Sequence, residues 1–549
     1  MEEDPQISQE SIKLLPNSIK SSKQESQGIT FDKALCKAGG FGSFQYYSCF
    51  FLMIIYVSNG YVFYALTYLE LFPDYICPES NPKCDHTDRC KDPSIQINWS
   101  STRSLHNWVE TLDLECADSY KIGLLGSLYF AGWTVSCIFV PRLADLYGRK
   151  WPMMISAIAS VPIYTGLILS RNLELSIVLF FLLGCCCTGK SSTAYVYLIE
   201  LVPQNRQAYV GTFMLFGDGS TMIFLSLYFR FITKDWFWFQ LIGVLLTGVA
   251  CLACFFIPES PKFLYSYKKY DKARETINYI SKFNRNSHNA NHYKFDQEII
   301  EEQNKSKSQI QVAMSIANQS NPIDQELVII KDQSFIFRTQ IDMNLSNIPV
   351  ATDEQPSGSI KELLRNRRHL MNLLIVLLLW IVAAFDYFLI NFQLKYIDGD
   401  IYINTIVSSV SEVTAYIISG ALYSTIGTKV SFVSSFAISI VGSFLYILIG
   451  DKANNLVAVM VLGTKFGVSA AFNLVYLVNT LFPPIYASTT LGFFNCFARL
   501  ASMLAPQFAE FSKPVPMIIF CIMAAVALVG SFFLRTAPVK SSTVKMLKE

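Results

Sequence analysis

The sequence predicts an all-α integral membrane protein with twelve transmembrane helices in two halves of six. Of its 549 residues, 52% are hydrophobic and only 16% are charged, whereas soluble domains carry about 25% charged residues. Charge is nearly absent from repeated blocks of about 20 residues, which suits helices crossing a hydrocarbon core of about 30 Å. Only helices can carry such runs, because lipid cannot satisfy a bare backbone. The pattern excludes a soluble enzyme, a disordered protein and a secreted disulfide scaffold. It also argues against a membrane β-barrel, whose strands are short and alternate in polarity.

The apolar blocks fall on either side of a long polar segment. The first half (residues 46–257) holds six blocks, at 46–69, 121–143, 151–170, 175–201, 209–232 and 236–257. The second half (370–535) holds six more, at 370–394, 401–425, 430–449, 456–481, 489–511 and 515–534. Residues 258–369 connect the halves, and their centre at 285–359 is rich in Asn, Gln and Ser, which predicts partial disorder with a short helix near 295–315. Residues 1–45 form an N-terminal leader and residues 536–549 a C-terminal tail.

Basic residues near the helix ends set the orientation, since cytoplasmic flanks are enriched in Lys and Arg. The leader, the 2–3 and 4–5 loops and both ends of the connecting segment carry such residues. Because an even number of helices separates these segments, all of them lie on the same side of the membrane. We therefore expect the leader, the connecting segment and the tail to be cytoplasmic. The expected location is the plasma membrane, with an internal membrane as the alternative.

The 1–2 loop, at residues 70–120, should then face the outside or a lumen. It contains Cys77, Cys84, Cys90 and Cys116, which predict two disulfides with three possible pairings. It also contains Asn98 in an Asn-Trp-Ser sequon, which predicts a glycoprotein. The sequons at Asn304, Asn318 and Asn344 lie in the cytoplasmic connecting segment, so we expect them to stay unused.

Several other activities are not expected. A Walker A string at 184–191 lies inside an apolar block, where its amides are already bonded in a helix. Its small residues are therefore expected to allow close helix packing. The five His are scattered without metal-ligand spacing. We expect no catalytic site, no metal and no cofactor. A net charge of +2 gives no reason to expect nucleic-acid binding.

The loop between helices 2 and 3 reads Pro141-Arg-Leu-Ala-Asp145-Leu-Tyr-Gly148-Arg149-Lys150. It resembles the Gly-x-x-x-Asp-Arg-x-Gly-Arg-Arg/Lys motif of the major facilitator superfamily, with departures at the first Gly and the first Arg. The resemblance implies the major facilitator fold, with two six-helix halves around a central cavity.

Further strings are similar to the solute-carrier family of organic cation, anion and carnitine transporters. These are YVYLIELVPQNRQAYVGT (195–212), PESPKFLYSYKKYDKARETI (258–277), GFGSFQ (40–45) and GTKFGVSAAFNLVYLVNTLFPP (463–484). The resemblance implies a secondary transporter of small organic ions that works by alternating access, and not an enzyme. Its partners would be the substrate and the bilayer, and we expect a monomer. The sequence does not choose among uniport, exchange, and proton or sodium coupling, although Asp218, Asp386 and Glu412 are candidate proton carriers.

Two alternatives remain open. Sugar porters share the Pro-Glu-Ser-Pro segment, but they usually have a Gln-rich helix 7 and Pro-Glu-Thr after helix 12. Here helix 7 has no Gln before Gln393, and Arg535-Thr-Ala-Pro follows helix 12. The second alternative is a non-transporting transceptor or scaffold of the same fold. Erosion of the second-half loop motif, GALYSTIGTK (420–429), where Ser424 replaces the Asp, gives this alternative some weight against the transporter.

The same resemblance implies a cytoplasmic closing latch. Asp145 and Gly148 come from the 2–3 loop, together with the cations Arg149 and Lys150. Glu200 and Arg206 occupy the charged places at the 4–5 junction. We expect these residues to cluster.

Charges inside apolar helices normally face a cavity or a partner. They are Lys190, Asp218, Asp386, Glu412, Lys465 and Arg499. Arg499 occupies a position in helix 11 where its charge resembles that of the family's anion and carnitine branches. Arg can bind a carboxylate through two N–H groups of its planar guanidinium. The predicted substrate-binding residues are Arg499, Asp386, Tyr387, Phe388, Glu412 and Lys465. An anion or a carnitine-like zwitterion is favoured over a simple cation, with Asp386 as the counter-charge for Arg499 or for a substrate cation.

Overall fold

The computed structural model describes residues 28–79, 84–286, 290, 293–317, 367–397, 399–449, 456–482 and 487–535. The predicted tail, the first 27 residues of the leader and the sequons at Asn318 and Asn344 lie outside the described residues. The chain forms two compact units. The membrane unit comprises Ser43–Ser260 and Pro356–Glu549, and the small unit comprises Met1–Gly42 and Pro261–Gln355.

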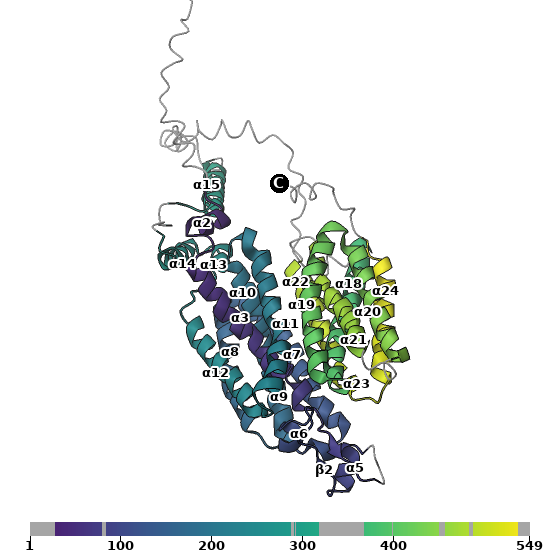
Figure 1. Cartoon of the computed structure of the whole chain (residues 1–549). Coiled ribbons are helices and arrows are strands. Elements are labelled where there is room, and N and C mark those ends of the chain that lie inside the picture. Colours follow the sequence, from purple (N-terminus) through teal and green to yellow (C-terminus); the bar gives the residue numbers. More distant parts are fainter. Residues whose placement is uncertain are drawn as a thin grey trace, which may run out of the picture. The chain divides into compact units, whose positions relative to one another are not determined.

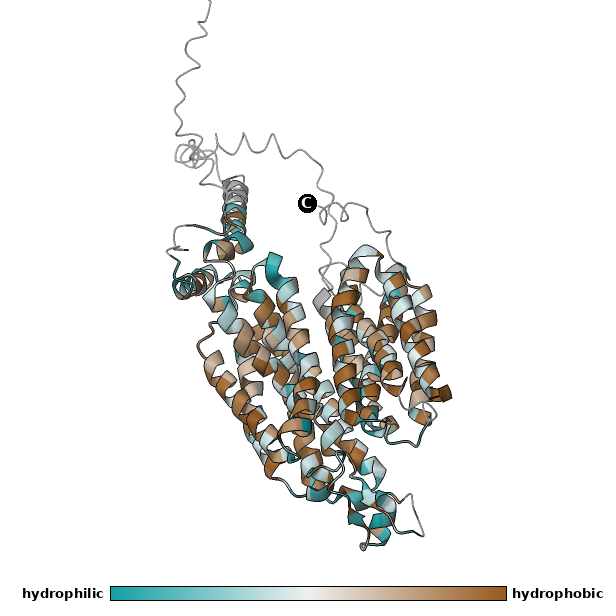
Figure 2. Ribbon diagram, viewed as in Figure 1, coloured by the Kyte–Doolittle hydropathy of each residue, from teal (hydrophilic) through white to brown (hydrophobic). Residues whose placement is uncertain are grey.

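The first half of the membrane unit consists of long apolar helices (Figures 1 and 2). They are α3 (Ser43–Phe63) with the short α4 (Leu66–Leu69), α7 (Ser119–Tyr147), α8 (Lys150–Leu169), α9 (Leu173–Thr188), α10 (Ala194–Glu200), α11 (Gln207–Leu227) and α12 (Trp236–Cys254). A π-helical turn, Gly189–Thr193, joins α9 to α10, and a second, Tyr228–Ile232, extends α11. The six predicted blocks all lie on these helices.

The second half repeats the pattern. Its helices are α18 (Arg367–Gln393), α19 (Ile401–Thr425), α20 (Thr428–Ile449), α21 (Val457–Leu477), α22 (Ala487–Ser502), α23 (Ala505–Ala509) and α24 (Val515–Phe532). Within the described residues, eleven helices of the chain are long and apolar enough to cross a membrane. The eleventh predicted block, 489–511, is divided between α22 and α23. Pro506 lies in the first turn of α23 and has no amide proton to continue the preceding helix, which accounts for the division.

The Walker-like string packs two helices together, as its small residues predicted. Gly184 on α9 faces the backbone of Tyr129 on α7, and Gly132 on α7 faces the backbone of Phe181 on α9. A side chain at either glycine would collide with the opposite main chain. The two halves meet along α7 with α22 and along α11 with α19.

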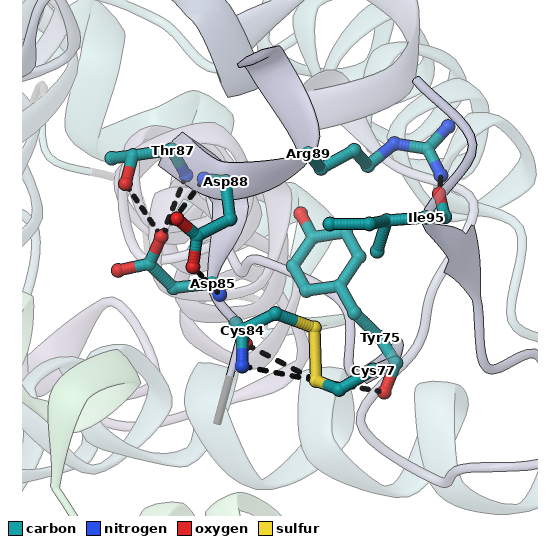
Figure 3. The surroundings of a disulfide bond; sticks show 8 residues. All are labelled: Tyr75, Cys77, Cys84, Asp85, Thr87, Asp88, Arg89 and Ile95. Atoms are coloured by element: carbon teal, nitrogen blue, oxygen red, sulfur yellow. Dashed lines mark hydrogen bonds between the residues drawn. A yellow bond between two sulfur atoms is a disulfide. The ribbon is translucent and has the colours of Figure 1, made fainter. Parts of the chain in front are cut away.

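The 1–2 loop folds into a disulfide-linked subdomain. The strands β1 (Tyr75–Ile76) and β2 (Gln96–Ile97) pair antiparallel, and α5 (His86–Lys91), α6 (Trp108–Thr111) and a 3-10 turn at Leu114–Cys116 complete it. Of the three pairings left open, the structure has Cys77–Cys84 and Cys90–Cys116. Figure 3 shows the first bond beside the capping residue Asp85, whose side chain accepts the amides of Thr87 and Asp88.

Asn98 in this subdomain provides a test of the orientation. Its side chain is partly exposed, and its Oδ1 accepts the Ser100 amide at 3.2 Å. Asn304 is exposed on α15 (Asp296–Ala317) of the small unit. We expect a glycosidase-sensitive mass shift that Asn98→Gln abolishes and Asn304→Gln does not. Sugar on Asn304 would overturn the predicted orientation.

The small unit joins the leader to the segment after helix 6. Its helices are α2 (Phe31–Lys37), α13 (Pro261–Ser266), α14 (Tyr270–Phe283) and α15. Ile29 forms a parallel bridge with Phe295, and Asn286 Nδ2 donates to the Lys37 carbonyl at 2.8 Å. The predicted short helix near 295–315 corresponds to α15. The end of the leader is therefore folded together with the connecting segment, which the sequence did not predict.

Candidate functional site

The membrane unit contains a cavity of about 720 Å³ lined by both halves. Aromatic side chains form much of its wall: Tyr64, Tyr129 and Trp133 from the first half, and Tyr387, Phe388, Phe472 and Tyr476 from the second. The lining continues to Tyr209 at the start of α11 and to Tyr423 near the end of α19. Those helix ends lie on the side that the basic residues predict to be cytoplasmic. The cavity therefore extends from the middle of the membrane unit toward that side.

Arg499 on α22 lies in the cavity wall, where the sequence predicted it. The residue is only 4% exposed. Its guanidinium carbon lies 3.7 Å from the ring centroid of Trp133 and 5.5 Å from that of Phe388. Nη2 donates to the Tyr476 hydroxyl at 3.4 Å, while Nε and Nη1 have no hydrogen-bond partner among the described residues. The planar fork is thus held against aromatic rings, with two buried nitrogens that lack an acceptor among the described residues.

Glu412 and Lys465 neutralise each other beside the cavity and do not line it. Lys465 Nζ lies 3.0 Å from Glu412 Oε2 and donates to Asn391 Oδ1 at 2.7 Å. Glu412 Oε1 accepts the hydroxyls of Tyr387 at 2.6 Å and Tyr416 at 2.8 Å. Both predicted residues therefore lie next to the site, but as a closed buried ion pair.

Asp386 lies apart from the cavity, although its neighbours Tyr387 and Phe388 line it. It is fully buried, and neither carboxylate oxygen has a partner in the described part of the chain. It makes no ion pair with Arg499, so the predicted counter-charge is wrong for this arrangement. The cause is helical geometry, because successive residues point about 100° apart around the axis.

Asp218 on α11 is the carboxylate that lines the cavity. Its Oδ2 accepts the Tyr64 hydroxyl at 2.9 Å, and the Tyr64 hydroxyl lies 3.1 Å from that of Tyr387. The sequence marked Asp218 as an intramembrane charge but did not assign it to the binding site. Nothing in the sequence alone indicates which face of α11 points inward.

The predicted latch is assembled around Arg149. Its Nη1 lies 2.6 Å from Asp145 Oδ1 and its Nε 3.4 Å from Glu200 Oε1. Burial alone would lower the pKa of Arg149, but Glu200 and Asp145 outweigh that effect and raise it. Arg206 is not part of this group, since its guanidinium lies over the Tyr209 ring at 6.0 Å.

Two residues of the Pro-Glu-Ser-Pro segment complete the latch, and sequence reasoning did not assign them a role. Glu259 Oε1 accepts the backbone amides of Arg149 at 2.9 Å and Lys150 at 3.2 Å. Ser260 Oγ donates to Glu200 Oε2 at 2.6 Å. Gly148 adopts φ 108°, a conformation that favours glycine. A side chain at this position would also collide with the Glu259 carboxylate. Glu259 and Ser260 are the middle residues of the Pro-Glu-Ser-Pro string, and this motif was the sequence feature that could have indicated their role.

The described latch contacts lie within the first half and are formed while the cavity extends toward the cytoplasmic side. The predicted closing role therefore requires that the outward-facing state makes further contacts with these residues. Weakening the latch should then favour the inward-facing state, because a lost contact biases only the states that make it. Asp145→Asn removes the Arg149 ion pair, whose aspartate is 56% exposed. The expected shift is therefore a few-fold, since exposed pairs contribute about 1 kcal/mol or less. Labelling of Asn495→Cys, a cavity position, with an impermeant maleimide from the cytoplasmic side should accelerate by that factor. Glu301→Gln, in the small unit, serves as the control. Equal labelling rates with and without Asp145→Asn would contradict the latch.

The opposite side is closed by a buried ion cluster, here called the outer gate. Lys395 Nζ lies 2.6 Å from Glu70 Oε2 and 2.8 Å from Glu510 Oε1, and the three side chains are only 1–6% exposed. Glu70 ends α4 in the first half, while Lys395 and Glu510 follow α18 and α23 in the second. The outer gate therefore joins the two halves. Burial is the main cause that raises the pKa of Glu70 to about 7, opposed by Lys395 and reinforced by Glu510.

A family model described as the Major Facilitator Superfamily matches residues 49–506. The chain belongs to the major facilitator superfamily. Among its relatives is human organic cation/carnitine transporter 2, 25% identical over 401 residues, which cover 72% of this chain and 62% of the human protein. The match thus spans about three fifths of that relative's length. An organic cation transporter-like protein of Drosophila melanogaster is 22% identical over 535 residues, covering 89% of this chain and 87% of that protein.

Solved structures show the same fold. The xylose transporter XylE from E. coli, in a partially occluded inward open conformation, aligns with a TM-score of 0.57 and 11% identity, over 91% of this chain and 99% of that one. At that identity the likeness concerns the fold alone. The predicted superfamily and the all-α major facilitator fold are both confirmed, and the chain is an integral, multi-pass membrane protein.

Proposed function

We propose that this major facilitator protein is a secondary transporter of small organic zwitterions. Its two halves would rock about the central cavity and expose it to each side in turn. The relatives named as organic cation/carnitine transporters support the organic-ion class. The choice of a zwitterion comes from the two opposite charges that line the cavity, Arg499 and Asp218.

The observation that carries the proposal is the buried guanidinium of Arg499, of which Nε and Nη1 lack an acceptor among the described residues. A buried charge whose N–H groups lack acceptors is costly, so such a group normally meets an anion. Nε and one Nη can grip a carboxylate in a two-pronged geometry that an ammonium cannot reproduce. Trp133 and Phe388 flank the guanidinium, and its Nε and Nη1 are buried in this arrangement, so a carboxylate reaches them when the neighbouring side chains move apart.

The cationic group of the substrate would be bound by Asp218 and the aromatic wall. Asp218 has no cation within ion-pair distance among the described residues, so its charge is available to a ligand. Tyr64, Tyr387 and Phe472 present rings nearby, and aromatic faces attract quaternary ammonium groups. A substrate with a carboxylate at one end and an ammonium at the other would satisfy both charged residues.

Uptake into proteoliposomes tests this proposal. Labelled carnitine carries both charges, choline carries only the ammonium and butyrate only the carboxylate. We expect saturable carnitine accumulation with kcat/KM at least tenfold above that of either probe. Saturable binding without accumulation would favour the transceptor alternative, and equal uptake of choline would refute the need for a carboxylate.

A further inference from the structure

A chain of hydrogen bonds crosses between the two halves at the edge of the cavity. Asp218 Oδ2 lies 2.9 Å from the Tyr64 hydroxyl, which lies 3.1 Å from the Tyr387 hydroxyl. The Tyr387 hydroxyl in turn lies 2.6 Å from Glu412 Oε1. Asp218 and Tyr64 belong to the first half, whereas Tyr387 and Glu412 belong to the second. Two carboxylates are therefore linked through two phenols.

The number of protons in this chain is informative. Each tyrosine hydroxyl supplies one proton, and an ionised carboxylate supplies none. With both carboxylates ionised, the two phenol protons serve the two carboxylate contacts. The contact between Tyr64 and Tyr387 then has no proton, so two oxygens face each other at 3.1 Å without a hydrogen bond. One additional proton completes the chain, because every oxygen can then donate to the next.

The surroundings indicate which carboxylate holds this proton. Glu412 is compensated as an anion by Lys465 at 3.0 Å and by the Tyr416 hydroxyl at 2.8 Å. Asp218 has neither advantage. With the proton on Asp218, the bonds run in one direction, from Asp218 to Tyr64 to Tyr387 to Glu412.

Charged and titratable groups approach Asp218 from each neighbouring helix. They are Tyr56 and Tyr64 from α3 and the turn after it, Tyr129 from α7, Tyr387 from α18, Glu412 and Tyr416 from α19, Lys465 and Tyr476 from α21, and Arg499 from α22. Lys465 is committed to Glu412 and Asn391, and the Arg499 guanidinium lies against Trp133. Neither cation forms an ion pair with Asp218 in the described part of the chain. A cation from solution has access to Asp218 through the cavity, which this carboxylate lines.

We propose that Asp218 is a proton-binding site, and that a proton and the cationic group of the substrate compete for its carboxylate, so that transport is an exchange of substrate for proton. Substrate binding breaks the Asp218 O–H bond, and the proton passes to water on the side to which the cavity is open. After the halves rock, the substrate leaves and Asp218 takes a proton from the water on that side. One proton therefore crosses against one substrate. This inference rests on the zwitterion transport proposed above.

The test uses the full-length protein in voltage-clamped proteoliposomes with a pH dye in the lumen. When labelled carnitine enters, the lumen should become alkaline by one proton for each carnitine. Lowering the luminal pH before the assay should accelerate carnitine entry. Asp218→Asn should reduce the proton signal at least tenfold. The matched control is Asp386→Asn. Asp386 is a buried acid that lies outside both the cavity and the hydrogen-bond chain, so this variant should retain the proton signal.

The outcomes separate the two proposals. Carnitine uptake without a change in luminal pH, or with acidification, would overturn proton exchange and leave zwitterion transport standing. Absence of both uptake and binding would overturn zwitterion transport and proton exchange together.

A binding measurement on the wild-type protein does not depend on the folding of a variant. In detergent, carnitine and choline should bind more weakly as pH falls, approaching tenfold per pH unit for one competing proton. Butyrate lacks the cationic group and should not show this loss. A carnitine affinity that is constant with pH would refute competition at Asp218.

Discussion

Arg499→Ala should reduce kcat/KM for carnitine at least 100-fold while leaving choline uptake within about threefold of the wild type. Truncating one partner of a buried, hydrogen-bonded charge pair costs about 2–5 kcal/mol, and 1.4 kcal/mol corresponds to about tenfold. The effect should be confined to ligands with a carboxylate, because Nε and Nη1 of Arg499 are buried donors that lack an acceptor among the described residues. Arg499→Lys keeps the charge but loses the planar fork, so an intermediate loss of about tenfold is expected.

The control for this comparison is Arg171→Ala, which removes an exposed arginine outside the cavity. It should leave both uptake rates unchanged. If Arg499→Ala instead transports carnitine at the wild-type rate and half-saturation, Arg499 is structural and the assignment of a carboxylate ligand fails.

Lys395→Ala should open the outer gate and shift the protein strongly toward the outward-facing state. The substitution leaves Glu70 and Glu510 buried without their cation, and breaking a buried pair costs about 3–5 kcal/mol. Opening hydrates both carboxylates, so the ratio of outward-facing to inward-facing protein should rise by at least about 100-fold. The measurement is maleimide labelling of Asn59→Cys, a cavity position, from outside. Lys121→Ala is the matched control, because its ion pair with Glu174 at 3.2 Å is exposed and lies within the first half.

A neutral gate distinguishes a lost ion pair from a damaged fold. Replacing all three charges by Glu70→Gln, Lys395→Met and Glu510→Gln should return labelling toward the wild-type rate, because no uncompensated charge remains. If Lys395→Ala leaves outside labelling unchanged, the cluster does not hold the halves together.

The outer gate should also respond to pH in a defined direction. With the gate closed, Glu70 has a pKa of about 7, whereas its ordinary value is 4.5 when it is hydrated. The closed gate binds the Glu70 proton more tightly than the open gate does. The stability that this proton adds to the closed gate is therefore full below pH 4.5 and is lost as pH rises through 7. Outside labelling should therefore increase between pH 5 and about 7.5 in the wild type. Glu70→Gln should abolish this dependence.

The sequence predicts the fold well because bilayer thickness imposes a strong one-dimensional constraint. Runs such as 370–394 and 430–449 can only be spanning helices, and the basic flanks orient them. The exception is 489–511, where the division between α22 and α23 depends on a single proline within an otherwise apolar run. The four loop cysteines predicted two disulfides, but their pairing required the folded loop.

The site was predictable only in part, because a charge in a helix does not reveal which way it faces. Arg499 and Tyr387 line the cavity as expected, whereas Asp386 points elsewhere and Asp218 takes the inward place. The outer gate was not predicted at all. Glu70 and Lys395 are 325 residues apart in the chain, and only the packing of the halves brings them together.

A structure determined with carnitine bound would show whether Arg499 and Asp218 bind the two charged groups of the substrate. We expect the carboxylate within hydrogen-bond distance of Nε and Nη1 of Arg499, and the ammonium near Asp218 among the rings of Tyr64 and Phe472. Carnitine in the reverse orientation, or outside the cavity, would contradict this assignment.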